Sequence, residues 1–212
     1  MSGTARQHVV YLVEDDPSAR EATLRFLRAA GHVVRAYASA SEFLVAVDAH
    51  ARGCLVLDLH LPDGSGLELQ RTLKAKAESL PIVFLSGDAE IRESVTAMKS
   101  GAVDFLTKSM DGSVLLEAIS VALARNEEEQ THQTRRRELR ARYEQLTPRE
   151  REVFAHLISG RLNKQISFDL GTAEATVKIH RHRVLTKMAA ASIADLVRMS
   201  ADLGIPAAHG SI

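Results

Sequence analysis

The sequence of 212 residues contains one cysteine, no tryptophan and few aromatic side chains, which make up 4% of the chain. The single cysteine, Cys54, excludes an intrachain disulfide and a cysteine-rich zinc site. No apolar run approaches the roughly 20 residues of a membrane-spanning helix, and the first residues lack the layout of a signal peptide. We therefore expect a protein of a reducing, cytoplasmic compartment with no membrane partner.

Net charge is also absent, but this zero conceals two unlike halves. Residues 1–124 carry 12 basic and 16 acidic side chains, whereas residues 125–212 carry 15 basic and 11 acidic ones. Hydrophobic residues make up 45% of the chain and charged residues 25%, which is typical of globular proteins. An acidic half joined to a basic half indicates two domains with different partners, and the basic half is a candidate for binding nucleic acid.

Residues 1–124 alternate between short apolar runs and amphipathic stretches of helix length. The five apolar runs lie at 8–13, 32–37, 54–58, 82–86 and 103–107. This alternation predicts an α/β domain, in which a parallel sheet is covered by helices on both faces.

The remaining chain shows no strand pattern. Residues 125–145 are strongly polar and lack Gly and Pro, which favours a helical linker, with a flexible tether as the alternative. Thr147 and Glu150 have the spacing of a capping box at a helix start. We predict an all-α domain over 146–212 with four short helices, at about 148–159, 163–170, 174–188 and 192–203.

Polar side chains follow the predicted strands where each strand ends. They are Glu14, Asp15 and Asp16 after the first strand, Asp58 after the third, Ser86 after the fourth and Lys108 after the fifth. In an open parallel sheet these ends meet at one crevice. Clustered carboxylates require a hard cation such as Mg²⁺, or a protonated carboxyl, and aspartate is an established nucleophile in phosphoryl transfer. Each residue alone fits a solvated loop, but the joint pattern favours an aspartyl-phosphate site.

The predicted helix 174–188 has two unlike faces. The apolar face is expected to pack in the core and contains Val177, Val184, Leu185 and Met188, with His180 beside it. The opposite face contains Lys178, Ile179, His182 and Arg183, flanked by Arg181 and Lys187. A preceding helix and a turn at Gly171 indicate a helix-turn-helix whose second helix enters a major groove. A solvated charged face is the alternative.

Residues 8–124 resemble the receiver domain of two-component response regulators, through YLVEDDPSAR, CLVLDLHLPDGSGLEL, PIVFLSGD and MKSGAVDFLTK. The resemblance implies a doubly wound, flavodoxin-like sheet of five parallel strands in the order 2-1-3-4-5. It also implies that a sensor histidine kinase phosphorylates Asp58. The Mg²⁺ ligands it implies are Glu14, Asp15, Asp58 and the backbone carbonyl of His60. The residues it implies for phosphoryl stabilisation and switching are Ser86, Lys108 and Phe105.

Three positions depart from the receiver pattern. Glu14 stands where Asp is usual, Asp88 where many relatives have His, and Ser109 where a proline follows the lysine. In the family that lysine–proline bond is typically cis, and a cis bond before a non-proline residue costs about 2.5–4 kcal/mol. We therefore predict a trans Lys108–Ser109 bond and a shifted loop.

The stretch LTPREREVFAHLISGRLNKQISFDLGTAEATVKIHRHRVLTKM resembles the LuxR-type helix-turn-helix domain. Both domains together resemble the NarL/FixJ class of transcription regulators, with the FixJ-like branch closest. The base-contacting positions implied are Lys178, Ile179 and His182. The positions implied to lie near phosphates are Asn163, Lys164, Thr176 and Lys187. The last helix is predicted to supply a dimer seam or part of its own domain core, through Ile193, Leu196, Val197 and Leu203.

The leading interpretation is a phosphorylation-controlled transcription regulator. Its expected partners are DNA, a sensor histidine kinase, RNA polymerase and a second copy of the chain. One alternative is a degenerate receiver that acts without phosphate. Another is a Mg²⁺-dependent phosphatase or phosphotransferase, but the residue two positions after Asp58 is His60, not an acid that protonates a leaving group. We therefore expect no enzyme.

Overall fold

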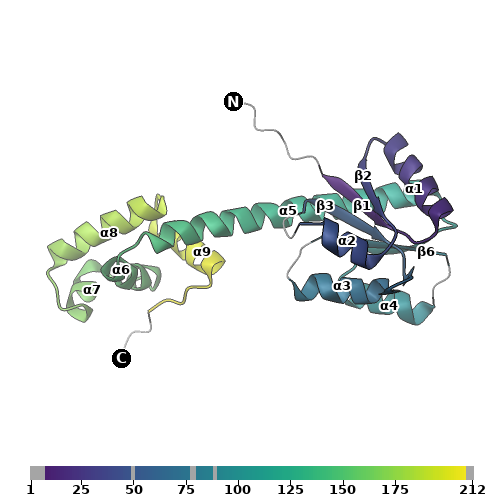
Figure 1. Ribbon diagram of the computed structural model, residues 1–212. Coiled ribbons are helices and arrows are strands. Elements are labelled where there is room, and N and C mark those ends of the chain that lie inside the picture. The colour runs from purple at the N-terminus through teal and green to yellow at the C-terminus, as the bar shows by residue number, and fades with distance from the viewer. Residues whose placement is uncertain (1–7, 49–50, 77–79, 88–89, 209–212) are drawn as a thin grey trace. The chain divides into compact units, whose positions relative to one another are not determined.

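The computed structural model describes residues 8–48, 51–76, 80–87 and 90–208 (Figure 1), so Asp88 lies outside the described residues. The chain divides into two compact units, Met1–Gln130 and Thr131–Ile212. Each unit has hydrophobic clusters of its own. The domain boundaries at 124 and 146 stay predictions. Within the described residues, no helix combines the length and the apolar character needed to cross a membrane.

The first unit is built on a parallel sheet with the strand order β2-β1-β3-β6-β7. Its strands are β1 (Val9–Val13), β2 (Val33–Tyr37), β3 (Gly53–Leu57), β6 (Ile82–Ser86) and β7 (Asp104–Thr107). The central strands β3 and β6 are buried along their whole length, as expected for apolar runs covered on both faces. Counted along the chain, these five strands lie in the order 2-1-3-4-5. The predicted α/β class is confirmed.

Helices cover both faces of this sheet (Figure 1). They are α1 (Pro17–Ala29), α2 (Ala40–Ala46), α3 (Gly66–Ala75), α4 (Ile91–Lys99) and α5 (Gly112–Glu144). Alternate residues of a strand point to opposite faces. Accordingly, Leu55 and Leu57 of β3 pack in the cluster that includes α2, α3 and α4, whereas Cys54 and Val56 pack with α1 and α5.

A small antiparallel hairpin was not predicted. It consists of β4 (His60–Leu61) and β5 (Gly64–Ser65), and it directly follows Asp58. The Gly66 N–H donates to the Leu59 carbonyl at 2.8 Å, which closes the hairpin at the start of α3. Two-residue strands are too short to show an alternating pattern, so the sequence carried no signal for them.

The start of β3 is held by a residue from α5. The Asn126 side chain, which is fully buried, accepts a hydrogen bond from the Gly53 N–H at 3.0 Å. Gly53 has a φ of +140°, and a Cβ placed on it would lie 1.7 Å from the Val9 carbonyl oxygen. Only glycine fits this close approach of β1 and β3.

Within its described residues, 131–208, the second unit is all-α and contains the end of α5 together with four further helices. These are α6 (Pro148–Ile158), α7 (Asn163–Asp169), α8 (Glu174–Met188) and α9 (Ile193–Leu203). The predicted capping box of Thr147 and Glu150 is present. The four-helix prediction is therefore confirmed.

The predicted dimer seam on α9 is mostly part of the core. Leu196 and Leu203 are buried in the unit's hydrophobic cluster, and Ile193 packs against it. Val197 differs, with 43% of its surface exposed. The core alternative therefore describes Leu196 and Leu203, because a helix covering a small domain must bury its apolar face there, and a dimer contact through Val197 stays a prediction.

Candidate functional site

Three carboxylates converge at the carboxyl ends of β1 and β3. One ligand oxygen from each of Glu14, Asp15 and Asp58 lies within 4.8 Å of the others. Glu14 is 1% exposed and Asp58 is 6% exposed, while Asp15 faces solvent. The donor set is oxygen-only with one open side, which fits a hard cation such as Mg²⁺.

Lys108 completes this cluster from the end of β7. Its Nζ lies 2.6 Å from Asp58 Oδ2 and 2.7 Å from Glu14 Oε2. Burial opposes the charged amine, but the two carboxylates outweigh it and raise the pKa of Lys108. Lys108 therefore stays charged, and the lysine that ends a strand has an anionic partner.

The electrostatics of Glu14 follow from the same packing. Burial raises the pKa of Glu14, and the nearby Asp58 charge raises it further, while the hydrogen bond from Lys108 lowers it in part. The net pKa lies above the ordinary value for glutamate. Burial and the charge of Asp58 therefore make Glu14 costly to ionise. A cation bound at this site would favour the ionised form of Glu14.

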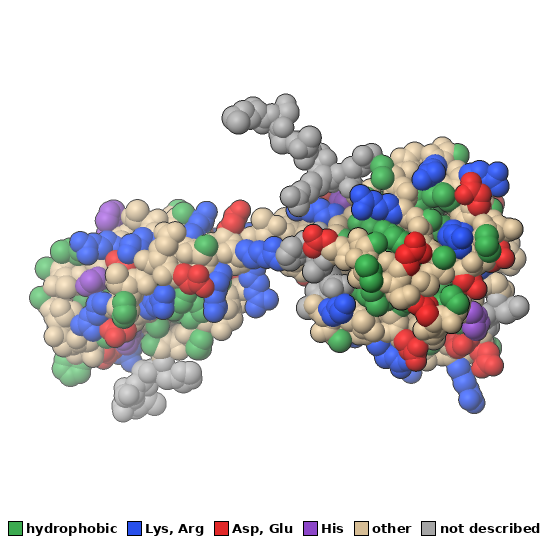
Figure 2. Space-filling model, viewed as in Figure 1, with side chains coloured by type: hydrophobic (Ala, Val, Ile, Leu, Met, Phe, Trp, Pro, Cys, Tyr) green, Lys and Arg blue, Asp and Glu red, His purple; other side chains and the backbone are tan. Residues whose placement is uncertain are grey.

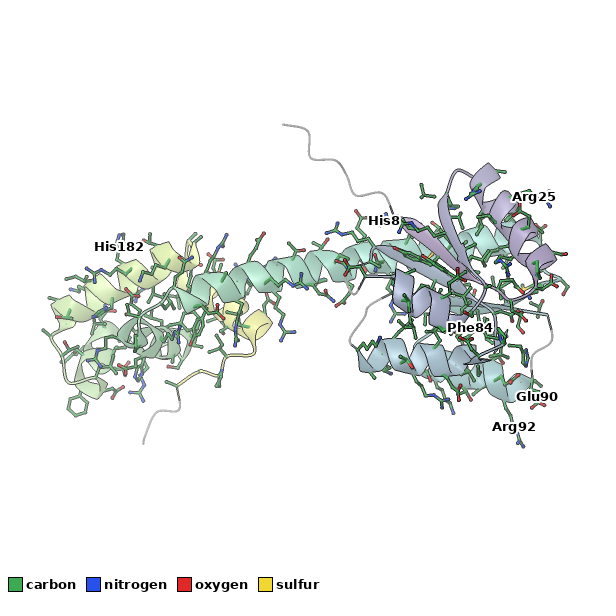
Figure 3. All side chains as sticks on the ribbon, viewed as in Figure 1. His8, Arg25, Phe84, Glu90, Arg92 and His182 are labelled. Atoms are coloured by element: carbon green, nitrogen blue, oxygen red, sulfur yellow. The ribbon has the colours of Figure 1, made fainter. Side chains whose placement is uncertain are left out.

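Ser86 and Phe105 lie on the neighbouring strands β6 and β7. Ser86 is 1% exposed, and its carbonyl accepts from the Lys108 N–H at 2.9 Å. Phe105 is half-buried and stacks on Phe84, with ring centroids 5.6 Å apart and planes 21° from parallel. Figure 3 labels Phe84, whose ring belongs to the cluster beneath α2, α3 and α4. Ser86 and Lys108 thus lie at the carboxyl ends of β6 and β7, whereas Phe105 lies two residues before the end of β7.

The Lys108–Ser109 bond is trans, since no cis peptide occurs among the described residues. This part of the prediction is confirmed, and Lys108 nevertheless reaches both carboxylates. Ser109 Oγ lies 3.2 Å from Thr107 Oγ1, so the residue in the proline position joins a local hydroxyl pair. The shifted loop stays a prediction.

His60 lies in β4, at the start of the hairpin. Its N–H donates to Asp58 Oδ1 at 3.3 Å, and its side chain is exposed. The predicted use of its carbonyl as a metal ligand stays a prediction. Gly66 also shapes this loop, because a Cβ there would lie 2.4 Å from the Asp58 carbonyl oxygen. The sequence offered no sign of that contact.

Arg20 of α1 was likewise missed. Its Nη1 donates to the carbonyls of Glu14 at 2.7 Å and Asp15 at 2.9 Å. The side chain thus ties the turn between β1 and α1 to the helix and holds the two acidic residues in place. The available signal was a cation in the first turns of the helix after the acidic residues, but such a cation is usually solvated.

Replacing Arg20 with glutamine is expected to weaken Mg²⁺ binding about 10-fold, because residues that orient metal ligands typically contribute 10–100-fold to affinity. Titration calorimetry with Mg²⁺ measures this. The matched control is Arg25→Gln on the same helix, where the arginine is exposed and forms only a 3.7 Å pair with Glu21. Unchanged affinity in Arg20→Gln would show that the turn holds its shape without the arginine.

The second site is the exposed face of α8. Lys178, Ile179, His182 and Arg183 are all exposed on it, and Ile179 is 54% exposed. Val177, Val184 and Met188 are fully buried, and Leu185 packs against them. Figure 3 shows His182 pointing away from the rest of the unit. This face therefore combines basic side chains with one exposed apolar side chain.

The residues that flank this face of α8 differ in their exposure and in their hydrogen bonds. Lys164 and Thr176 lie at the surface or near it, and Asn163 Oδ1 accepts from Arg181 at 3.4 Å. Half-buried His180 has an Nδ1 without a hydrogen-bond partner among the described residues. This agrees with its predicted packing beside the apolar face.

Lys187 has a strong partner inside the unit. Its Nζ lies 2.6 Å from Glu150 Oε2 and 3.1 Å from the Gln145 carbonyl. Glu150 is 2% exposed and also accepts the Thr147 N–H at 2.9 Å. Lys187 therefore joins α8 to the start of α6, a role that the sequence analysis did not foresee. Its predicted phosphate contact stays a prediction.

Glu150→Gln is expected to destabilise the helical unit by about 2 kcal/mol, since it removes the charge from two hydrogen bonds of a buried group. Burial raises the pKa of Glu150, but Lys187 and Thr147 outweigh it and hold the pKa below the usual value. This stabilisation is present above the ordinary glutamate pKa and is lost as the pH falls through the lowered one.

Urea unfolding, followed by hydrogen exchange in α6 and α8, measures the change. Glu152→Gln removes an exposed carboxylate two residues further along α6 and should cost under about 0.5 kcal/mol. Equal losses in the two variants would contradict the assignment.

Comparison with known proteins places both units. Residues 10–120 match the response regulator receiver domain, and residues 144–200 match the bacterial regulatory proteins of the luxR family. The response regulator protein TodT of Pseudomonas putida is 43% identical over 195 residues, which cover 92% of this chain and 86% of TodT. The transcriptional regulatory protein FixJ of Azorhizobium caulinodans is 37% identical over 196 residues, covering 92% and 93%.

A solved structure of the response regulator StyR is similar over the whole fold. It has a TM-score of 0.82 and 40% identity, and the match covers 92% of this chain and 98% of StyR. The receiver match alone spans more than half of the chain, and the alignment with TodT covers 92% of it and reaches into both matched regions. The chain therefore belongs to the two-component response regulators of the NarL/FixJ class, transcription regulators that join a receiver domain to a LuxR-type DNA-binding domain.

Proposed function

We propose that Asp58 accepts a phosphoryl group from a sensor histidine kinase. The main support is the position of Lys108 Nζ, which lies 2.6 Å from Asp58 and 2.7 Å from Glu14. These three residues follow the carboxyl ends of β1, β3 and β7. In the transfer, the phosphorus–nitrogen bond of the kinase phosphohistidine breaks and a phosphorus–oxygen bond to an Asp58 carboxylate oxygen forms. The kinase histidine leaves with the electron pair.

The residues around Asp58 divide the work of this transfer. Glu14, Asp15, Asp58 and the His60 carbonyl would hold Mg²⁺, which when bound neutralises charge on the phosphoryl oxygens. Lys108 then exchanges part of its contact with the carboxylates for a phosphoryl oxygen. Ser86 orients a second phosphoryl oxygen from the end of β6, and Phe105 reports the change through its packing on Phe84.

The output is sequence-specific DNA binding by the helical unit in a cytoplasmic homodimer. Lys178, Ile179, His182 and Arg183 of α8 read a major groove, while Asn163, Lys164, Thr176 and Lys187 lie along the backbone phosphates. Two copies place their α8 helices about 34–36 Å apart, one turn of DNA, at a site where RNA polymerase is contacted. The chain carries out no turnover of a separate substrate.

Beryllofluoride with Mg²⁺ tests the phosphorylation step, because it mimics an aspartyl phosphate. It is expected to change the oligomeric state of the full chain and to raise its affinity for DNA. Asp58→Asn should abolish both this response and labelling by a small phosphodonor.

The matched control is Asp63→Asn, from the same loop. Asp63 accepts the Ser41 N–H at 2.8 Å, outside the cluster, so this variant should respond like the parent. Persistent labelling of Asp58→Asn would refute the acceptor. A folded parent that ignores beryllofluoride would favour a degenerate receiver.

A further inference from the structure

Half of the 14 Lys and Arg side chains within residues 131–208 have a carboxylate partner. Five such pairs are Arg135–Asp202, Arg140–Glu144, Arg149–Glu152, Arg161–Asp169 and Lys187–Glu150. Within residues 131–208, in contrast, the exposed side chains of Arg136, Arg137, Lys164 and Arg183 form no hydrogen bond or ion pair. Lys164 and Arg183 belong to the helix-turn-helix. Arg136 and Arg137 lie on α5, outside every predicted DNA contact.

The end of α5 is a fixed part of the helical unit. Leu139 is 4% exposed in its core, and Tyr143 packs edge-on against Phe154 with ring centroids 5.4 Å apart. Arg142 Nη1 donates to the carbonyl of Met188, the last residue of α8, at 3.4 Å. Arg136 and Arg137 lie five to six positions earlier on the same helix, or about 8–9 Å along its axis. They therefore lie on the same helix as the contact that Arg142 forms with the C-terminal end of α8.

Basic residues outnumber acidic ones on α8 and on residues 131–144 of α5, where Glu138 and Glu144 are the acidic residues. Figure 2 shows Lys and Arg side chains over α8 and along the adjoining end of α5. Two adjacent unpaired arginines repel each other, and bound counterions offset that repulsion in water. A polyanion that releases those counterions gains free energy from doing so. Arginine is also the side chain best shaped to grip a phosphate.

We infer that Arg136 and Arg137 bind backbone phosphates of DNA beside the segment contacted by α8, and so extend the DNA interface onto α5. This inference rests on the proposed DNA binding of the helical unit. The contacts are sequence-independent: they add affinity and salt dependence without selecting bases. The interface thus includes the helix that leads into the DNA-binding domain.

The test is the salt dependence of binding of the full chain to a fluorescent duplex of about three helical turns. Each lost phosphate contact lowers the slope of log affinity against log salt by about 0.9. In the double variant Arg136→Gln/Arg137→Gln, the magnitude of this slope should therefore fall by about 1–2. The variant should also bind the duplex roughly 10-fold more weakly at 0.1 M salt. Circular dichroism checks that each variant keeps its helices.

Two controls separate the possible outcomes. Arg135→Gln/Arg140→Gln removes the same charge from the same helix but takes it from ion-paired arginines, so its slope should change little. Arg183→Gln tests α8 and should lower the slope by about 1. A parental slope in the Arg136/Arg137 variant, or an equal loss in the Arg135/Arg140 variant, overturns the inference while α8 binding stands. A parent that binds no duplex overturns both proposals.

Discussion

Replacing Gly53 with alanine is expected to destabilise the receiver domain by about 2–6 kcal/mol or more. The backbone φ of +140° is strained for any residue with a Cβ, at about 1–3 kcal/mol. The added Cβ would also lie 1.7 Å from the Val9 carbonyl oxygen, which forces β1 and β3 apart at about 1–3 kcal/mol or more. A domain is typically stable by only about 5–15 kcal/mol. Urea unfolding with hydrogen exchange in β1 and β3 measures the loss.

Gly101→Ala is the matched control for this effect. Gly101 has a φ of +100°, but nothing lies within 4 Å of an added Cβ. This variant therefore carries the backbone strain alone and should lose about half as much stability or less. If both variants lose the same free energy, the contact with Val9 is not the cause.

Lys108→Met is expected to destabilise the receiver domain by about 2–3 kcal/mol at pH 7, because it leaves Glu14 and Asp58 side by side in a buried site without their cation. Burial and Asp58 already raise the pKa of Glu14, and the loss of Lys108 raises it further. The variant therefore takes up a proton at a higher pH than the parent does. The difference in unfolding free energy between the parent and Lys108→Met should therefore decrease as the pH falls and the Glu14 carboxyl becomes neutral.

Thermal unfolding at several pH values, with and without Mg²⁺, checks this expectation. Mg²⁺ supplies the missing positive charge, so it should raise the unfolding temperature of Lys108→Met more than that of the parent. Lys99→Met, which removes an exposed lysine of α4, should behave like the parent. An equal response to Mg²⁺ in the Lys108 and Lys99 variants would mean that Lys108 does not balance the carboxylates.

The main sheet and the helical unit were predictable because their periodic patterns are long. Each predicted apolar run became a strand, and each predicted helix of the second unit appears within about two residues of its expected bounds. The convergence of Asp58 and Lys108 was also predictable, since parallel strands bring their carboxyl ends to one edge. These inferences used only patterns that are local in the sequence.

Contacts between distant positions were not predictable in this way. The partnership of Lys187 with Glu150 depends on how α8 crosses α6, and no spacing in the sequence encodes that crossing. Arg20 and Gly66 contact backbone carbonyl groups. Every residue has such a group, so the residue types in the sequence do not reveal these contacts. The stripe of α9 was ambiguous, because an apolar helix face looks the same whether a neighbouring helix or a second copy covers it.

The hydrogen bond between Asn126 and Gly53 determines where the chain can be truncated without loss of stability in the receiver domain. A fragment that ends at residue 124 keeps every strand but loses the acceptor for a buried N–H at the start of β3, at a cost of about 1–3 kcal/mol. A fragment that ends at Gln130 keeps this contact. An isolated receiver should therefore carry the first turns of the polar stretch of α5, and a graft of this input domain onto another output domain should be joined beyond them.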